Sequence, residues 1–327
     1  MKKNLILALA VMTALCACND KPKQQSEQIP SDATAKTEAA AQESAEVPPI
    51  LAPCVNGLPL FAPFNDGDII DGGRILKQSP EKYTKFIMGD EVFDVTYKEE
   101  KNKDLEHDGS YLNQYFYKSK DLMKGQVYNY ADPKAVENFF KTHGDMTVEG
   151  DIVPRDYWEG ILVSADYLKG RSVIRHFPTT TEDPDGPEFS ANVVANVEKE
   201  LGMKVEKNRI AYVFGKNDEY KFGIMQTKPN DKYAIAAWVL AEGNNLCIYT
   251  DTCEVENEEG ESRVYWSNYD PDEYMEPNVV AVVKGENGLD IYAQHMNTDE
   301  TSYYYLMRQE GKKMKQINLG GFYQMYE

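Results

Sequence analysis

The stretch around Trp266 combines aromatic rings with polar groups in a way that suits ligand binding. Tyr265, Trp266 and Tyr269 are close neighbours, asparagine and aspartate residues lie among them, and Tyr274 follows beyond a proline. Flat rings stack on the faces of sugars, and adjacent oxygen and amide groups hydrogen-bond to sugar hydroxyls. The sequence therefore indicates a glycan-stacking site formed by Trp266, Tyr269 and Tyr265. The alternative is that these rings pack within a sheet or cover its edge.

Residues of the kinds used in catalysis show no recognisable pattern. The four histidines, His107, His143, His176 and His295, are not spaced with one another or with an acid in a known motif. The sequence has no H-E-x-x-H motif, no G-x-S-x-G motif and no glycine-rich phosphate loop. We assign no catalytic residue, so a non-catalytic protein is the first expectation. A hydrolase whose site is assembled from distant residues is an alternative, because such sites are defined by geometry.

Two aspartate- and glycine-rich segments bring oxygen ligands close together. They are residues 66–72 and residues 183–186. Neither matches the calcium loop of EF-hands, which needs ligands at alternate positions, a glycine at the sixth and a glutamate at the twelfth. Turn-forming residues explain both segments without a metal. No cofactor is assigned, and calcium is the one ion that the sequence leaves open.

Three cysteines outside the leader can form one disulfide. Cys247 and Cys253 face each other if the chain turns near Thr250 and Asp251. If this stretch is a straight strand, the two residues are about 20 Å apart and cannot bond. Cys54 can pair with either of them. The candidate disulfide is Cys247 with Cys253, conditional on that turn.

The beginning of the chain carries the clearest signal. Lys2 and Lys3 precede an apolar run over residues 5–15, and Leu-Cys-Ala-Cys ends at Cys18. The run is too short for a stable membrane span and is typical of a secretory signal. The tetrapeptide resembles the lipobox of bacterial lipoproteins. The alternative is an ordinary secretory signal with a cysteine at its cleavage site.

The lipoprotein resemblance implies a location and a membrane partner. It implies cleavage before Cys18, acylation of that cysteine, and attachment of the chain to the lipid bilayer. Asn19 follows the cysteine, where an aspartate holds many lipoproteins at the inner membrane, so the resemblance favours the outer membrane. The periplasmic and surface faces stay open. The formal charge of −19 argues against a nucleic-acid partner, because the chain repels phosphate backbones.

The expected elements divide the chain into four parts. Residues 1–17 are the signal peptide, and residues 18–52, rich in Ala, Glu, Gln and Ser, are a disordered linker. Residues 53–185 are expected to form a mixed α/β N-terminal part, and residues 186–327 a C-terminal part rich in antiparallel strands. The proline-rich, acidic passage over 179–187 is the expected boundary between these last two.

Helices and hairpins within these parts follow from capping and turn residues. Helices are expected over 80–88, 133–143 and 189–201. The first two begin with a capping residue and a proline, and all three are followed by glycine. Residues 160–167 and 171–177 read as a hairpin. Four further hairpins have strands over 209–214 with 220–227, 233–241 with 246–250, 279–283 with 289–296, and 303–308 with 314–317.

We therefore expect an α+β fold, with an antiparallel meander dominating the C-terminal half and a few short helices, preceded by a disordered tether. The expected function is that of a membrane-tethered envelope lipoprotein that binds an unknown protein partner or ligand. The first alternative is a glycan-binding lipoprotein of a nutrient-uptake assembly. The second is the hydrolase with a dispersed site.

Overall fold

The computed structural model describes residues 49–55, 57–64, 79–103, 123–143, 145–148, 151–154, 157–179, 186–258, 261–264, 266, 274, 276–296 and 301–323. These residues belong to a unit that begins at Glu46. The signal peptide, Cys18, most of the linker, His107, Tyr265 and Tyr269 lie outside the described residues. The first candidate calcium segment, 66–72, also lies outside them, and so do residues 183–185 of the second.

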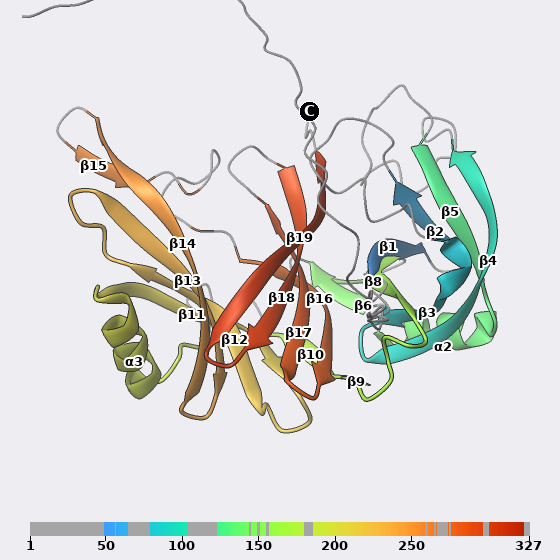
Figure 1. The fold of residues 1–327 in the computed structure, drawn as a ribbon, viewed down its shortest axis with the longest axis horizontal. Helices are drawn as coiled ribbons and strands as arrows, with labels where there is room; N and C mark the ends of the chain where they lie inside the picture. Colours follow the sequence, from blue (N-terminus) through green and yellow to red (C-terminus); the bar gives the residue numbers. More distant parts are fainter. Residues whose placement is uncertain are drawn as a thin grey trace, which may run out of the picture. The chain divides into compact units, whose positions relative to one another are not determined.

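The fold is all-β, so the expected α+β class is wrong. The described part consists mainly of strands, which form two large sheets and one small one, with the two α-helices α2 (Pro133–His143) and α3 (Ala191–Leu201) (Figure 1). Neither of these helices has the length and apolar character required to cross a membrane. Both were predicted from the sequence. Asp132 caps α2 by accepting a hydrogen bond from the backbone N–H of Lys134 at 3.0 Å, and Gly202 ends α3 at a φ of 68°.

The helix expected over residues 80–88 is absent, which accounts for part of the error in class. Ser79 and Pro80 begin only a short 3-10 turn, η2 (Pro80–Lys82), and the chain continues as strand β3 (Tyr83–Met88). Phe86, Ile87 and Met88 are all buried, because β3 has a neighbouring strand on each side and is covered on both faces. A short, continuous apolar run of this kind has no periodicity that separates strand from helix.

The first large sheet has six antiparallel strands and curls back on itself. Its order is β1 (Ile50–Val55), β8 (Tyr157–Ser164), β3, β4 (Glu91–Lys103), β5 (Met123–Tyr130) and β2 (Leu60–Phe64). The two edge strands, β1 and β2, are consecutive in the chain and contact each other. Val136, Phe139 and Phe140 of α2 belong to the core of this sheet. A separate two-stranded sheet pairs β6 (Asp145–Val148) with β7 (Asp151–Pro154).

The second large sheet has eleven strands and is built from two meanders. The first consists of β11 (Val205–Phe214), β12 (Tyr220–Thr227), β13 (Tyr233–Glu242) and β14 (Asn245–Glu258), and β15 (Glu261–Val264) pairs with the end of β14. The second consists of β16 (Asn278–Gly285), β17 (Gly288–Met296), β18 (Thr301–Glu310) and β19 (Lys313–Tyr323). All four hairpins expected in this region form.

The edges of this sheet approach each other through one short segment. Its terminal strands are β9 (Ser172–Val173), which pairs with β16, and β10 (His176–Pro178), which pairs with β11. Only Ile174 and Arg175 separate them. The N–H of Ile174 donates to the carbonyl of Val282 at 2.8 Å, and the carbonyl of Arg175 accepts from Gly215 at 2.8 Å. The two residues therefore bridge the opposite edges of a curled sheet.

The hairpin expected between residues 160–167 and 171–177 does not form. Strand β8 lies in the six-stranded sheet, whereas β9 and β10 lie in the eleven-stranded sheet. The chain passes from one sheet to the other between Ser164 and Ser172, upstream of the passage over 179–187.

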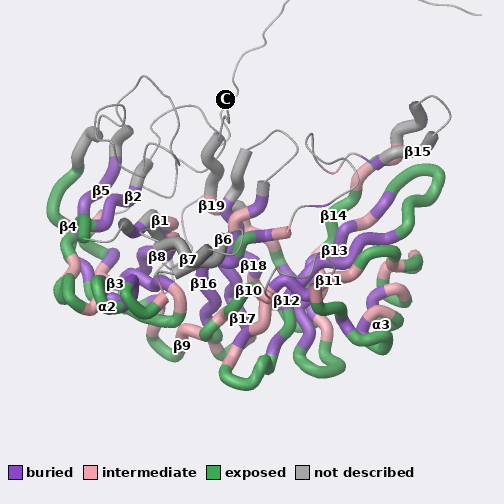
Figure 2. The backbone as a smooth tube through the Cα atoms, turned by 180° about the vertical axis from the view of Figure 1, so that it is seen from behind, coloured by how far each residue is buried: buried purple, intermediate pink, exposed green. Residues whose placement is uncertain are grey.

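Three apolar clusters hold the eleven-stranded sheet in place. One fills its concave side and contains Trp238, Phe222 and Met307. A second lies between α3 and the other side of β11, β12 and β13. A third joins the two large sheets and includes Ile161 of β8 with Tyr292 of β17. Buried positions follow the middle of the strands, and exposed ones gather at the turns (Figure 2).

Candidate functional site

Trp266, the described member of the predicted stacking site, lies against Tyr274. Its ring meets the Tyr274 ring edge-on, with centroids 5.2 Å apart. Tyr274 is buried and stacks on His295 at 4.9 Å, and His295 in turn meets Trp238 at 5.4 Å. Trp266 itself is only half-buried. The described part of this stretch is thus a chain of packed rings that ends at the surface with Trp266.

A polar chain holds Tyr274 in position. The indole N–H of Trp238 donates to the Tyr274 hydroxyl at 3.0 Å, and that hydroxyl donates to Oδ2 of Asp251 at 3.4 Å. Burial, with the charge of Asp251 adding to it, raises the pKa of Tyr274 well above its usual value. The hydroxyl therefore stays protonated and has both hydrogen-bond roles filled within the protein. Tyr274 is a core residue, as the alternative interpretation of this stretch held.

The cysteines are thiols in this structure. Cys247 and Cys253 both lie on β14, opposite Leu240 and Ala234 of β13, so the turn on which their pairing depended does not form. Cys54 lies in the six-stranded sheet, where its sulfur is 2.8 Å from the Tyr130 hydroxyl. Burial raises the pKa of Cys54 to about 12 and that of Cys247 to about 11. Neither of these two thiols is a thiolate at neutral pH, and the thiolate is the reactive form.

His143 and His176 lie on a helix and on a strand, respectively. His143 packs on Phe139 of its own helix at 4.7 Å, at the C-terminal end of α2, as its position in the sequence predicted. His176 lies on β10, where burial lowers its pKa to about 4. Among the residues that the structure describes, no group of three or more histidine, cysteine or carboxylate side chains is arranged to hold a metal ion.

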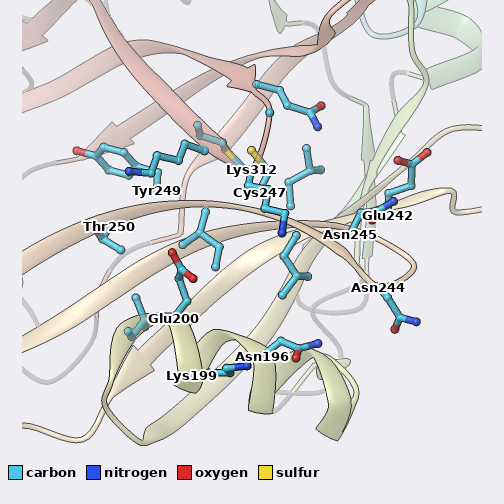
Figure 3. Close-up of a pocket in the computed structure, with 18 of the residues that line it drawn as sticks. Asn196, Lys199, Glu200, Glu242, Asn244, Asn245, Cys247, Tyr249, Thr250 and Lys312 are labelled. Atoms are coloured by element: carbon cyan, nitrogen blue, oxygen red, sulfur yellow. The ribbon is translucent and has the colours of Figure 1, made fainter.

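A large cavity lies elsewhere, at the end of the eleven-stranded sheet where several hairpins turn. Ile248 of β14 pairs with Lys313 of β19, so the turn before β14 and the turn before β19 lie at the same end. A groove of about 1160 Å³ opens there, between α3, the start of β14 and the turn between β18 and β19. In Figure 3, Asn196, Lys199 and Glu200 project from α3 on one side of β14.

The lining of the groove mixes amides, charges and apolar surface. Polar lining residues include Asn196, Lys199, Glu200, Glu242, Asn244, Asn245, Gln309, Lys312 and Lys313. Leu246, Cys247 and Ile248 supply apolar surface, and two tyrosines, Tyr220 and Tyr249, also contribute. The Tyr249 hydroxyl is already bound, because it donates to Gln316 Oε1 at 2.8 Å. Amides and ammonium groups are thus the side chains best placed to contact a ligand.

A second cavity is smaller, at about 320 Å³. It is lined by the turn between β16 and β17, by residues 169–171, and by Asp290, Arg308 and Gln309. Arg308 forms two parallel hydrogen bonds to Asp290, each 2.8 Å long. Gln309 of β18 contributes to the lining of both cavities.

A buried tyrosine pair contacts two of the residues that line the second cavity, Asp290 and Arg171. The hydroxyls of Tyr167 and Tyr292 are 2.7 Å apart, and that of Tyr167 donates to Asp290 at 3.4 Å. Arg171 covers the Tyr167 ring at 4.3 Å and donates to the Tyr167 carbonyl at 2.7 Å. Arg171 and Arg308 both line this cavity, and these contacts fix the position of Arg171.

Sequence reasoning missed the groove and found its parts. The turns before β14 and β19 were predicted from Gly243 to Asn245 and from Glu310 with Gly311, but each as an isolated hairpin. The two turns are brought together by the parallel pair between Ile248 and Lys313, which no local sequence pattern predicts. Tyr274, the described end of the aromatic stretch, lies toward the other end of the sheet, since it contacts His295 near the end of β17.

No model of a known protein family matches this sequence, and neither a curated protein nor a solved structure matches it. The function is therefore argued from the residues of this chain alone.

Proposed function

We propose that this protein is a lipid-anchored binding module of the bacterial envelope, whose eleven-stranded sheet takes a ligand in the groove beside α3. The single observation that carries the proposal is the size and lining of that groove. Pockets for small ligands have volumes of about 300–1,000 Å³, and this one measures about 1160 Å³. The space suits a ligand larger than one small molecule, such as an oligomer or a peptide.

The side chains around the groove have hydrogen-bonding capacity to spare. Those of Asn196, Lys199, Glu200, Asn245, Lys312 and Lys313 make no hydrogen bond or ion pair with another described residue. Asn244 uses only part of its amide, because its Oδ1 accepts from Asn192 at 2.9 Å and its NH₂ group forms no hydrogen bond with another described residue. A ligand that enters the groove can satisfy these groups without breaking a bond within the sheet.

The proposed anchor is the acylated Cys18, by resemblance to the lipobox of lipoproteins. Each buried CH₂ group of an acyl chain contributes about 0.8 kcal/mol, and two chains are needed for stable attachment. The linker after Cys18 then separates the sheets from the bilayer. In this proposal the outer membrane holds the protein, and the ligand is an envelope component or arrives from outside.

Photocrosslinking in intact bacteria tests whether the groove is a binding site. A photoreactive phenylalanine analogue replaces Asn245 in the groove or, as the control, Lys232, which is exposed at the opposite end of β13. We expect a specific adduct from position 245 and none from position 232. Equal labelling from both positions, or no adduct from either, would contradict the proposal.

A further inference from the structure

We propose that the groove beside α3 binds an acidic oligosaccharide, one whose sugars carry carboxylates, at the turn end of the eleven-stranded sheet. This inference rests on the proposed function, because it names the ligand class of the same groove. It is drawn from the charge and the amides of the groove.

The groove has more cations than acids in a strongly negative chain. The whole chain has 54 acidic residues against 35 lysines and arginines. The groove instead has the three lysines Lys199, Lys312 and Lys313 against two glutamates. The smaller cavity has the cations Lys169, Arg171 and Arg308 beside Glu286 and Asp290. A positive site on a negative protein attracts an anion and orients it, because the rest of the surface repels it.

The cations differ in what they already contact. Lys169 pairs with Asp166 at 2.6 Å, and Arg308 pairs with Asp290, so these charges serve the protein itself. Lys199, Lys312 and Lys313 form no ion pair with another described residue. Lys312 and Lys313 are also exposed. The charges available to a ligand are therefore those of the larger groove, and the smaller cavity offers a wall that is already neutralised.

Gln309 is held at the edge of the groove. Its Oε1 accepts from the backbone N–H of Leu289 at 3.1 Å, which holds the side chain against the turn between β16 and β17. The approach is close, since a Cβ atom at Gly288 would lie 2.7 Å from that oxygen. The amide NH₂ of Gln309 forms no hydrogen bond with another described residue. A ligand in the groove can therefore accept a hydrogen bond from this amide.

The amides distinguish a sugar from other anions. Four carboxamides line the two cavities, those of Asn196, Asn244, Asn245 and Gln309. A carboxamide both donates and accepts, and so does a sugar hydroxyl, whereas an acidic peptide presents mostly carboxylates and a regular backbone. Ammonium groups that bind the carboxylates and amides that bind the hydroxyls together fit an oligosaccharide of uronic acids.

Titration calorimetry on the soluble chain from residue 18, with a Cys18→Ser replacement, tests the assignment. The probes are tetramers of galacturonate, mannuronate and glucuronate-containing glycan, with the methyl ester of the galacturonate tetramer as the neutral match. We expect at least one acidic tetramer to bind, with an affinity at least tenfold above that of a neutral ester. The affinity should fall as salt rises from about 0.05 to 0.5 M, because the interacting charges are exposed.

Two double variants identify the site. Lys312→Gln with Lys313→Gln should lower the affinity for the acidic tetramer at least tenfold. The matched control is Lys228→Gln with Lys232→Gln, at two exposed lysines near the opposite end of β12 and β13. This control should keep the affinity for the acidic tetramer within twofold of the wild type. A thermal unfolding scan shows that each variant is folded.

Three results would overturn the proposal. They are no binding of any acidic tetramer, equal binding of the ester, and equal loss in both double variants. Tight binding of poly-glutamate at the same site would replace the sugar by an acidic peptide and would equally reject it. An adduct at position 245 that persists after such a result would show that the groove binds another ligand, so the two proposals fail separately.

Discussion

Ile248 of β14 and Lys313 of β19 form a single parallel pair that joins two antiparallel meanders into one sheet. The N–H of Ile248 donates to the carbonyl of Lys312 at 3.2 Å across this junction. Beyond it, no further pair between the two strands is formed in the described part of the chain. The groove is lined by residues on both sides of this pair, so the junction that closes the sheet also builds the candidate site.

Replacing Ile248 with proline should open this junction. Proline removes the N–H that bonds to Lys312 and so removes the bond that crosses between the meanders. We expect unfolding in urea to show that the free energy of unfolding falls by at least about 1 kcal/mol, because this backbone hydrogen bond is no longer formed. Ile248→Val, which keeps the N–H, is the control, and a loss in the valine variant as large as in the proline variant would contradict the role of the backbone bond.

Tyr274→Phe should destabilise the protein although it removes a single oxygen atom. The buried indole N–H of Trp238 would lose its acceptor, and Asp251 would lose a donor. Leaving a buried donor unsatisfied costs about 1–3 kcal/mol. The same substitution at the exposed Tyr233 should change stability by less than about 0.5 kcal/mol. Equal denaturation midpoints for the two variants would show that the polar chain does not contribute.

His176 should make stability depend on pH between about 6.5 and 4. Burial lowers its pKa to about 4, against the charge of Asp90 and hydrogen bonds with Ile174 and Val279, which act in the opposite direction. In the unfolded chain the imidazole titrates near pH 6.5, so as the pH falls below this value the unfolded state binds a proton that the folded state does not. Stability therefore decreases with falling pH across this window.

The His176→Gln variant measures that contribution. Between pH 7 and pH 4, we expect the free energy of unfolding to fall by up to about 3 kcal/mol more in the wild type than in the variant. One pKa unit corresponds to about 1.4 kcal/mol. Carboxylates titrate in both proteins, so the difference between the two curves isolates the imidazole. Parallel curves would show that His176 titrates alike in the folded and unfolded chains.

Gly223 on β12 should tolerate no side chain. A Cβ atom there would lie 2.0 Å from the backbone oxygen of Arg209 on β11, where the two strands shift register. Gly223→Ala should cost at least about 3 kcal/mol, because a backbone clash cannot be relieved by moving a side chain. Gly243→Ala is the comparison, since that glycine has a φ of +58° but open space around it, and should cost about 1 kcal/mol. Equal losses would show that β11 moves to accommodate the methyl group.

Cys18→Ser should release the protein from the membrane. Without the thiol there is no site for acylation, and the hydrophobic contribution of the acyl chains is lost. Fractionation of cells that carry the variant should then show the chain in the soluble fraction, and the wild type in the membrane fraction. Retention of the serine variant at the membrane would contradict a lipid anchor at this residue.

Local turn chemistry made the hairpins of the second sheet predictable. Gly243, Gly288 and Gly311 all adopt positive φ values in the turns where the sequence placed them, and these are conformations that glycine adopts without strain. Helix α3 was predictable for the same reason, because Gly202 takes the left-handed conformation that ends a helix. Each of these signals acts over only a few residues.

Contacts between distant segments were not predictable. The run Phe86 to Met88 is apolar at successive positions because β3 is covered on both faces, and that pattern was mistaken for a helix. Thr250 and Asp251 have turn chemistry, yet β14 passes straight through them because β13 pairs with it along its length. The groove depends on the Ile248–Lys313 pair across 65 residues of chain, so only part of its lining could be found from sequence.

The bridging segment around Ile174 and Arg175 bears on how the chain assembles as it is made. Every partner of β1, β2 and β3 has been synthesised once residue 164 has emerged, so the six-stranded sheet can form early. Strand β9 must wait for β16, more than a hundred residues later, and contacts of such long sequence separation form slowly. The edges of the eleven-stranded sheet are therefore left unprotected for the longest time, and a nascent chain should need a holding chaperone most during that interval.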